Sequence, residues 1–394
     1  MMNQMKDDTG LLYAGDELDG DVLHADAPPI FLASAYAMGD LHELVETVDA
    51  DGYVYNRIAN PDRNALGKAI SYLENGQKTF VCSSGMAAIN LALHTCTKQG
   101  DHILANSSLY GETIDLMDNI LPRYGIETSY ANFTNPDEIR KAIRPNTKVL
   151  YTEVISNPLT TLVDLDEVAA VAHGARAVLM VDSTFTTPFV IKPLEHGADL
   201  VMHSLTKYFG GHSDLTAGSI TYNDPEIGAE LRNQYILTGC CADPVSSWLC
   251  LRSVRTMGLR VRKQIENAEL LSRALLKNPH VRRVNHPSLD THPQRELAKR
   301  MFPHGCGAML SFSVADDREK INEFLHRLQF VKYLTTLGGL RTSMSHPVSS
   351  SHYGVPEEIR LKMGIHEGLL RVSVGTEDID DLISEFNSAL DVFT

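Results

Sequence analysis

Short apolar runs alternate with helix-like segments through the middle of the chain, and this alternation constrains the fold more than any other feature. Most of the runs are rich in Val, Ile and Leu without polar alternation, which is typical of strands buried on both faces of a mostly parallel sheet. The runs are KTFVC 78–82, HILAN 102–106, KVLYTEVI 148–155, AVLMVD 177–182, DLVMHS 199–204 and GSITY 218–222. Helix-like segments lie between them at 86–97, 111–124, 135–143 and 166–173. The pattern predicts a doubly wound α/β domain.

The pattern changes at about Pro244, where a long helical stretch begins. Short strand candidates follow near 281–285, 308–313 and 370–374, so this part is predicted to be a smaller α+β domain. The first residues are irregular and form either a solvated segment or an arm that contacts a second subunit. The predicted units are an N-terminal arm (1–55), an α/β domain (56–245) and a C-terminal α+β domain (246–394).

Composition excludes several classes of protein. The chain has 394 residues, of which 43% are hydrophobic, enough for a large core. Lys and Arg total 35 against 50 Asp and Glu, so no positive excess exists to neutralise nucleic-acid phosphates. We expect no membrane span and no secretion signal, and therefore a cytoplasmic protein. The six cysteines contain no C-x-x-C pair, which favours reduced thiols over disulfides and gives no indication of a metal site.

Polar and aromatic side chains follow five of the predicted strands. In an open α/β sheet, ligands bind at the carboxyl ends of the strands. A small-residue turn, SSGMAA 83–88, opens a helix after the first run, and Tyr110, Asn157, Asp182 and the SLTK segment 204–207 follow later runs. Taken singly, such residues are usually helix caps, ion pairs or core side chains. Together they offer phosphate donors, an aromatic face, an amide, a carboxylate and an amine.

Pyridoxal 5'-phosphate (PLP) is the cofactor that requires this set of groups. It needs a lysine to form an imine, a carboxylate to keep its ring nitrogen protonated, a ring to stack on, and donors for its phosphate. We assign the imine to Lys207, the carboxylate to Asp182 and the stacking ring to Tyr110. The phosphate donors would be the hydroxyls of Ser204 and Thr206 and the N–H groups of Gly85 and Met86.

The segment SLTK also matches the S-x-x-K motif of penicillin-binding enzymes, in which Ser204 would be a nucleophile and Lys207 its partner. The other two elements of that family are missing, since no K-T-G occurs and HSDL replaces S-D-N. That motif begins a helix, whereas this segment closes a predicted strand. An exposed turn with no chemistry is the third interpretation of the segment.

The chain resembles the transsulfuration enzymes of Cys/Met metabolism, from PPIF near residue 29 to RVSVGTEDIDDLI at 371–383. The motifs that carry the resemblance are YNRIANP 55–61, SSGMAA 83–88, LYGET 109–113, VDSTFTTP 181–188, HSLTKYFGGHSD 203–214 and LGGLRTSMSHP 337–347. The resemblance implies a fold-type I PLP-dependent enzyme with a large, mostly parallel α/β domain and a smaller C-terminal α+β domain. It also implies a homo-oligomer, a tetramer built from dimers that share their active sites.

The resemblance further implies roles for individual residues. Lys207 would hold the cofactor and move protons among substrate carbons, and Tyr110 would act as acid or base with a pKa lowered by nearby charge. Asn157 would bond the phenolic oxygen of the cofactor, and Tyr55 and Arg57 would reach the phosphate of the neighbouring subunit. The implied substrate-binding residues are Arg371, which would clamp the α-carboxylate, Thr336 and Glu112.

Three positions depart from the pattern of the family. Glu112 stands where methionine γ-lyases typically carry cysteine, Thr335 stands where cystathionine γ-lyases and γ-synthases usually carry glutamate, and Arg341 replaces an acidic residue. A carboxylate at Glu112 would favour a substrate with a cationic far end, such as cystathionine or canavanine. A first-turn acid that stabilises its own helix is the other interpretation of Glu112.

These observations predict γ-elimination from a homoserine-derived amino acid such as cystathionine or methionine, which gives 2-oxobutanoate and ammonia. The alternatives are γ-replacement, as in cystathionine γ-synthase or O-acetylhomoserine sulfhydrylase, and a γ-lyase for canavanine. A PLP-binding regulator without catalysis is a second class of protein, against which the set Tyr110, Lys207 and Arg371 argues.

Overall fold

A computed structural model describes residues 5–16 and 25–394; residues 1–4 and 17–24 of the predicted arm lie outside this range. Its larger sheet has seven strands. They are β1 (Lys78–Cys82), β2 (His102–Asn106), β3 (Glu127–Ala131), β4 (Thr147–Glu153), β5 (Val178–Asp182), β6 (Leu200–Ser204) and β7 (Gly218–Tyr222). All six predicted strands are present, with ends shifted by no more than two residues.

The spatial order of this sheet is β1-β7-β6-β5-β4-β2-β3. Strands β6, β5, β4, β2 and β3 are parallel, whereas β7 runs antiparallel to both of its neighbours, β1 and β6. The sequence did not reveal β3, because its residues ETSYA are mostly polar and half-exposed at the sheet edge. The predicted mostly parallel sheet is confirmed, with β7 as its antiparallel exception.

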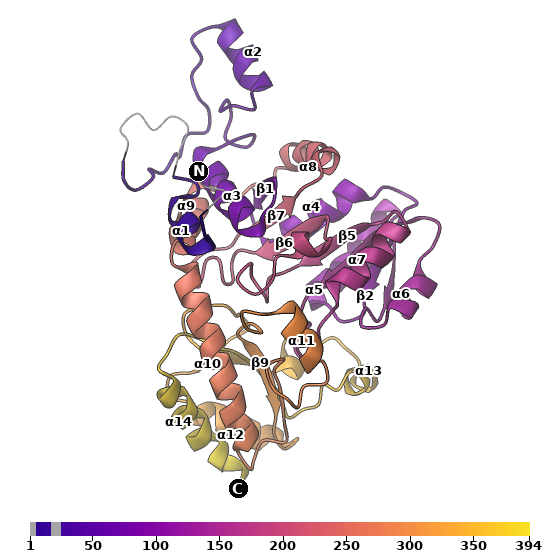
Figure 1. Cartoon of the computed structure of the whole chain (residues 1–394), viewed down its shortest axis with the longest axis vertical. Coiled ribbons are helices and arrows are strands. Elements are labelled where there is room, and N and C mark those ends of the chain that lie inside the picture. The colour runs from indigo at the N-terminus through magenta and orange to yellow at the C-terminus, as the bar shows by residue number, and fades with distance from the viewer. Residues whose placement is uncertain (1–4, 17–24) are drawn as a thin grey trace.

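Helices cover both faces of the larger sheet (Figure 1). They are α3 (Pro61–Glu74), α4 (Gly85–Cys96), α5 (Gly111–Asp115), α6 (Pro136–Ala142), α7 (Leu165–Gly174), α8 (Pro225–Thr238) and α9 (Pro244–Val254). The helix predicted at 111–124 is shorter than expected, because α5 passes into a π-helical turn, Leu116–Ile120, and a 3-10 turn, Leu121–Tyr124. Another 3-10 turn, Pro193–His196, precedes β6.

Successive residues of the central strands enter two different cores. Leu179 and Val181 of β5 join the apolar cluster beneath α3, α7 and α9, whereas Met180 joins the cluster beneath α4 and α8. This alternation shows that both faces of the sheet are buried, as the uninterrupted apolar runs predict. Continued to the strand ends, it places Asp182 and Ser204 on the α4 side of the sheet.

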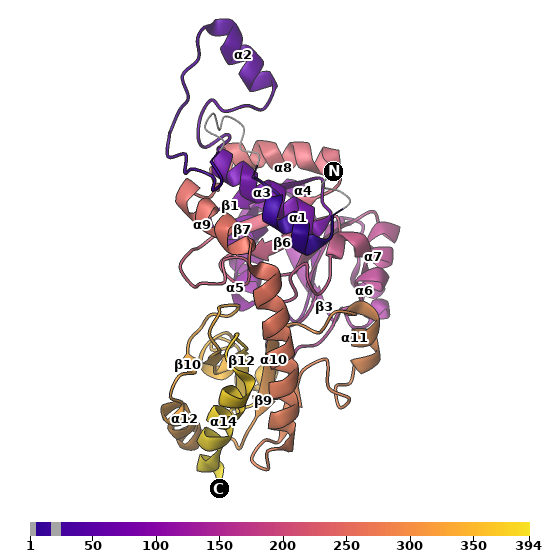
Figure 2. The same cartoon turned by 60° about the vertical axis from the view of Figure 1, so that its left-hand side comes forward.

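The C-terminal part forms a second sheet with the order β10-β11-β12-β9-β8. Its strands are β8 (Arg283–Asn285), β9 (Met309–Ser313), β10 (Lys332–Tyr333), β11 (Ser343–Ser345) and β12 (Leu369–Ser373). Its helices are α10 (Met257–Lys277), α11 (Arg295–Met301), α12 (Arg318–Arg327), α13 (Glu357–Lys362) and α14 (Ile379–Leu390), with 3-10 turns at Pro347–Ser349 and Asp391–Phe393. The long helix α10 runs from the large domain along the smaller one (Figure 2).

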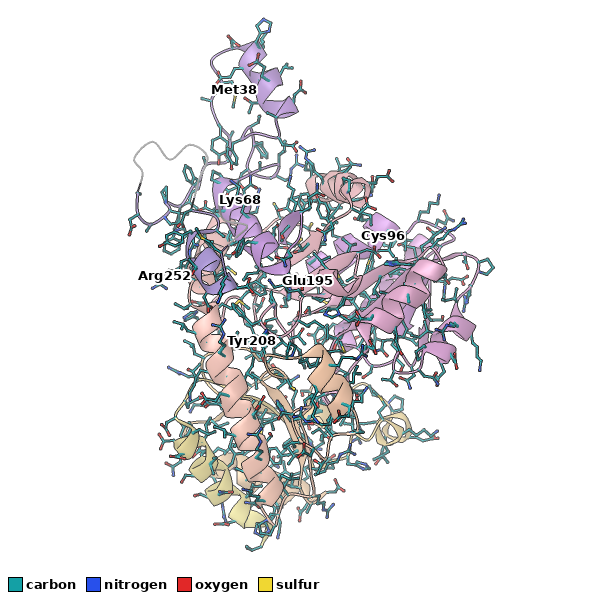
Figure 3. All side chains as sticks on the ribbon, in the orientation of Figure 1. Met38, Lys68, Cys96, Glu195, Tyr208 and Arg252 are labelled. Atoms are coloured by element: carbon teal, nitrogen blue, oxygen red, sulfur yellow. The ribbon has the colours of Figure 1, made fainter. Side chains whose placement is uncertain are left out.

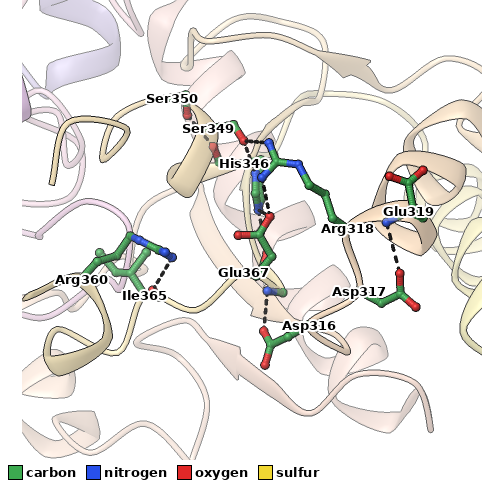
Figure 4. A network of polar contacts seen from close by, with 11 residues as sticks. Asp316, Asp317, Arg318, Glu319, His346, Ser349, Ser350, Arg360, Ile365 and Glu367 are labelled. Carbon is green, nitrogen blue, oxygen red and sulfur yellow. Dashed lines mark hydrogen bonds and ion pairs between the residues drawn. The ribbon is translucent and has the colours of Figure 1, made fainter. Parts of the chain in front are cut away.

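A polar network holds the segment that leads into β12 (Figure 4). Arg318 of α12 donates to the Glu367 carboxylate at 2.7 Å and to Ser349 Oγ at 2.8 Å. His346 Nε2 donates to the Glu367 carbonyl at 2.6 Å. The Asp316 carboxylate accepts the N–H of Gly368 at 2.7 Å. These bonds fix the start of the strand that carries Arg371.

The N-terminal region divides into two parts. Helix α1 (Asp7–Tyr13) lies on its own chain, where Leu11 is buried and Arg262 pairs with Asp8 at 2.7 Å. Helix α2 (Leu41–Asp49), in contrast, extends away from the body of the molecule (Figures 1 and 2). Over the described ranges, none of the helices is both long and apolar enough to cross a membrane.

Candidate active site

A cavity of about 250 Å³ opens where the strands of the larger sheet end, between this sheet and the C-terminal domain. Tyr208, at the junction of the two domains in Figure 3, directly follows one of its lining residues. The lining residues are Ser84, Gly85, Met86, Ile89, Tyr110, Glu153, Ile155, Asn157, Asp182, Thr184, Phe185, Ser204, Thr206, Lys207, Thr216, Thr335, Leu337 and Arg371.

The turn between β1 and α4 forms one end of the cavity. Ser84 caps α4, and its hydroxyl accepts the N–H of Ala87 at 3.0 Å. The first N–H groups of the helix, those of Gly85 and Met86, have no intrahelical acceptors, and both residues line the cavity, where such groups could bind an anion. A side chain at Gly85 would place its Cβ 2.9 Å from the Cβ of Ser204. Glycine at 85 therefore allows the Ser204 hydroxyl to lie against the turn.

Two threonines make hydrogen bonds around Ser204 and Thr206, the residues predicted to donate to a phosphate. Thr184 Oγ accepts the N–H of Ser204 at 2.8 Å, which connects the ends of β5 and β6. Thr206 Oγ donates to the Ala217 carbonyl at 3.3 Å and accepts the Ala217 N–H at 3.1 Å. The long outgoing bond of Thr206 is the one that an anion in the cavity would replace.

Two carboxyl groups stand side by side at the ends of β4 and β5. Glu153 and Asp182 are directly paired in the parallel register. Burial and the neighbouring Asp182 raise the pKa of Glu153 to about 8. Burial also raises the pKa of Asp182, although hydrogen bonds from Thr184 oppose this rise. A cation between strand ends, such as a protonated ring nitrogen, would stabilise the charged form of Asp182.

Lys207 projects into the cavity from the turn after β6. Its Nζ donates to Thr336 Oγ at 3.2 Å. Burial and the Arg371 guanidinium lower the pKa of Lys207, while Glu112 opposes this shift. Gly338, with φ of 75°, lies so close to Lys207 that a Cβ there would be 2.9 Å from the Lys207 carbonyl carbon. The glycine thus lets the loop carrying Thr336 approach the lysine.

Arg371 on β12 lies opposite, only 6% exposed. One of its terminal nitrogens donates to Asn157 Oδ1 at 3.0 Å, and its Nε has no partner among the described residues. Burial lowers the pKa of Arg371 to about 10. A buried guanidinium with an unpaired donor at a cavity wall provides a site for a carboxylate.

Tyr110 borders the cavity beside Glu153, whose carboxylate accepts the Tyr110 N–H at 2.6 Å. The prediction of a lowered pKa for Tyr110 is wrong for this structure. Burial and the Glu112 carboxylate raise the pKa of the phenol, and the lowering effect of Arg371 is smaller. The phenol is therefore protonated near neutral pH. Glu112 itself is exposed, but its charge acts on both Tyr110 and Lys207.

Tyr55 and Arg57 do not line this cavity. Both are exposed, and the Arg57 guanidinium lies over the Tyr55 ring at 5.8 Å from its centroid and donates to the carbonyl of Ile236. Among the three departures from the family pattern, Thr335 lines the cavity, Glu112 acts on it by charge, and Arg341 is exposed.

Four polar or aromatic lining residues outside the predicted turn 83–88 were not singled out from the sequence, namely Glu153, Thr184, Phe185 and Thr216. Glu153 was hidden inside the apolar run 148–155, which we assigned to a strand as a whole. Thr184 and Phe185 directly follow Asp182, so inspection of the complete strand end could have identified them. Thr216 gives no signal of its own in the sequence.

The arrangement fits PLP. Gly85 leaves space for a phosphate beside Ser204, Asp182 is a half-buried carboxyl with a raised pKa that a cation would lower, and Arg371 has an Nε without a partner among the described residues. The acyl-transfer interpretation of SLTK fits less well, because the Lys207 amine bonds Thr336 and not Ser204.

Comparison with known proteins agrees with this geometry. Residues 8–391 match the family described as Cys/Met metabolism PLP-dependent enzyme. Cystathionine γ-lyase of Bacillus subtilis is 38% identical over 98% of this chain and all of its own length. Cystathionine β-lyase of Lactococcus lactis subsp. cremoris is 36% identical over 92% of this chain and 93% of its own.

The solved structure of cystathionine γ-synthase from Xanthomonas oryzae pv. oryzae, in complex with aminoacrylate and cysteine, superposes with a TM-score of 0.93 and 33% identity, covering 99% of this chain and 98% of that one. The predicted fold class and cofactor are thereby confirmed. The chain belongs to the Cys/Met metabolism family of PLP-dependent enzymes and is an enzyme of the cystathionine and methionine lyase type.

Proposed function

We propose that the enzyme catalyses γ-elimination from an amino acid that carries sulfur or another heteroatom at Cγ. One water is consumed, and the products are the protonated leaving group, 2-oxobutanoate and ammonia. The γ-lyase among the relatives supports this choice, while the β-lyase and the γ-synthase show that the family contains other reactions.

The observation that carries the proposal is the position of the Lys207 amine between Arg371 and Thr336. Arg371 would bind the substrate α-carboxylate and so bring Cα towards this amine. Because burial and Arg371 lower the pKa of Lys207, a larger fraction of the amine is neutral and able to accept protons from Cα and Cβ. Thr336 would orient the amine between the two carbons.

Tyr110 would donate the proton to the departing heteroatom. Its raised pKa keeps the phenol protonated near neutral pH, as an acid requires. PLP, when bound, supplies an electron sink for charge that develops at Cα and Cβ. Asn157, whose oxygen accepts from Arg371, would use its NH₂ group to hold the phenolic oxygen of the cofactor.

A substrate panel tests the proposal. The holoenzyme is incubated with cystathionine, methionine, homocysteine, canavanine and O-acetylhomoserine, and 2-oxobutanoate is measured, with Lys207→Ala as the inactive control. We expect 2-oxobutanoate from at least one substrate without an added thiol. Rapid thioether formation from O-acetylhomoserine and cysteine, with no 2-oxobutanoate from any substrate, would instead establish γ-replacement.

The charge of Glu112, which acts on both Tyr110 and Lys207, would favour a substrate whose far end is cationic, as in cystathionine or canavanine. If Glu112 recognises that end, Glu112→Gln should raise KM for cystathionine and leave KM for methionine unchanged. Equal effects on both substrates would refute this recognition.

We also propose that two copies of the chain share their active sites. Helix α2 carries Leu41, Leu44, Val45 and Val48 on one face, with exposures of 81%, 37%, 59% and 52%. None of its residues is buried, so an apolar stripe remains available for a second copy. Tyr55 and Arg57 follow this arm and would reach the phosphate of the neighbouring copy.

Subunit mixing tests the shared site. Arg57→Ala and Lys207→Ala are each expected to be inactive, but a denatured and refolded mixture should regain about 25% of wild-type activity, because half of the dimers are hybrids with one intact site. No recovery in hybrids verified by mass spectrometry would show that Arg57 acts within its own chain.

A further inference from the structure

The loop that carries Asn157 belongs to the large domain but is bonded to the C-terminal domain at two places. The loop closes on itself where Ile155 and Leu162 form an isolated antiparallel bridge. One contact with the C-terminal domain is the hydrogen bond from Arg371 of β12 to Asn157 Oδ1, at 3.0 Å. The other joins the main chain of Leu162 to Gln294, the residue that precedes α11.

Gln294 bonds both main-chain groups of Leu162. Its Oε1 accepts the Leu162 N–H at 2.7 Å, and its Nε2 donates to the Leu162 carbonyl at 2.7 Å. The amide thus pairs with this residue as the backbone of an antiparallel strand would. Gln294 is the N-cap residue of α11, yet its side chain makes no hydrogen bond to that helix. The side chain serves the contact between the domains instead.

The backbone of this loop requires support from outside. Thr160 has a φ of 55°, in the left-handed region that β-branched residues rarely adopt. Its side chain is 1% exposed, and its hydroxyl has no partner among the described residues. Ser156 and Thr161 are bonded to each other within the loop, at 2.9 Å and 3.1 Å. A strained residue persists only where its surroundings fix it, and Gln294 fixes the end of this loop.

We propose that Gln294 is a positioning residue for Asn157. By bonding Leu162 it holds the loop in the conformation in which Asn157 bonds Arg371 and can donate to the phenolic oxygen of PLP. Gln294 does not line the cavity, so its effect on the site passes through the loop. The inference rests on the proposed role of Asn157 toward the cofactor, but not on which reaction the enzyme catalyses.

Two properties of the holoenzyme should depend on Gln294. A donor on the phenolic oxygen draws negative charge away from the neighbouring imine, which then loses its proton at lower pH. Loss of this donor should therefore raise the pH at which the absorption of bound PLP changes. Arg371 would also lose the bond to Asn157 that orients its guanidinium, so an amino acid should bind more weakly through its carboxylate.

The test uses Gln294→Leu, which keeps the size of the side chain and removes both bonds to Leu162. The absorption of bound PLP is titrated with pH and then with alanine, which has an α-carboxylate and no group to eliminate. We expect the pH midpoint to rise by about 0.7 unit and the dissociation constant for alanine to rise about fivefold, as for loss of one ordinary hydrogen bond. If this variant does not fold, Gln294→Glu, which lacks only the donor to the Leu162 carbonyl, should shift both values in the same directions.

Asn146→Leu is a matched control. Asn146 is also a half-buried amide that bonds a main-chain carbonyl, that of Gly100 at 2.9 Å, but it lies at the opposite end of β4 from the cavity. It should change neither the pH midpoint nor the affinity for alanine. Equal shifts in the two variants, or a Gln294→Leu protein that is less stable in urea with both values unchanged, would overturn the positioning role.

A double variant tests whether the effect passes through Asn157. Asn157→Ala should shift both values by itself, and adding Gln294→Leu should then shift them no further. Full additivity of the two changes would overturn the inference while leaving the role of Asn157 intact. If Asn157→Ala alone changes neither value, the proposed role of Asn157 fails, and the inference fails with it.

Discussion

Replacement of Arg371 by lysine isolates the role of the guanidinium from that of its charge. Arg371 is 6% exposed, donates to Asn157 Oδ1 at 3.0 Å, and has a buried Nε without a partner among the described residues. Lysine would retain the positive charge but could not bond both the substrate carboxylate and Asn157 in the same geometry. The variant should therefore lose one charge-assisted hydrogen bond.

Such a bond contributes roughly 1.5–3 kcal/mol, so kcat/KM should fall about 10- to 150-fold. If the carboxylate is held equally in the ground state and the transition state, the loss appears in KM while kcat is nearly unchanged. The assay is steady-state kinetics on the best substrate of the panel, and the absorption of bound PLP verifies that the cofactor site is intact.

Arg360→Lys is a matched control, because Arg360 is also buried, bonds the Ile365 carbonyl at 3.1 Å and does not line the cavity. It should change kcat/KM less than threefold, an effect below about 0.7 kcal/mol. Equal losses in the two variants would refute the assignment of Arg371 as the carboxylate clamp.

Three further predictions concern charge, space and stability. Glu112→Gln removes a charge that raises the pKa of Lys207, so the rising limb of the kcat pH profile should move to lower pH; a shift to higher pH would contradict the structure. Gly85→Ala should weaken PLP binding to the apoenzyme about tenfold, because the new Cβ would lie 2.9 Å from the Ser204 Cβ. An unchanged dissociation constant for PLP would show that the phosphate does not bind between Gly85 and Ser204. Glu74→Ala removes the partner of His203 in a fully buried pair, so it should lower the free energy of unfolding, measured in urea, by about 3 kcal/mol. A similar loss on replacing an exposed acidic residue by alanine would show that the effect does not come from the buried pair.

The strands and most of the cavity were predictable from sequence for one physical reason. Strands buried on both faces require uninterrupted apolar runs, and in a parallel sheet the residue after each run must lie at the same edge. Tyr110, Asn157, Asp182 and Lys207 were found by this rule and do line one cavity.

The rule fails where a functional residue lies within a run or where the strand is at an edge. Glu153 belongs to β4 itself, and β3 is too polar to produce an apolar signal. The pKa of Tyr110 was also beyond the sequence, because its direction depends on burial and on which charges packing brings near the phenol. The motif identified Glu112, but it could not show that this carboxylate raises the pKa of both Tyr110 and Lys207.

The antiparallel strand β7 between β1 and β6 has a consequence for folding. It joins the turn at Gly85 to Ser204, two parts of the cradle that are distant in the sequence. Contacts of large sequence separation form slowly, because chain entropy opposes them until the intervening strands are in place. During refolding, helix content should therefore recover before the protein regains the ability to bind its cofactor. The absorption of bound PLP would then report when β7 has paired with β1 and β6.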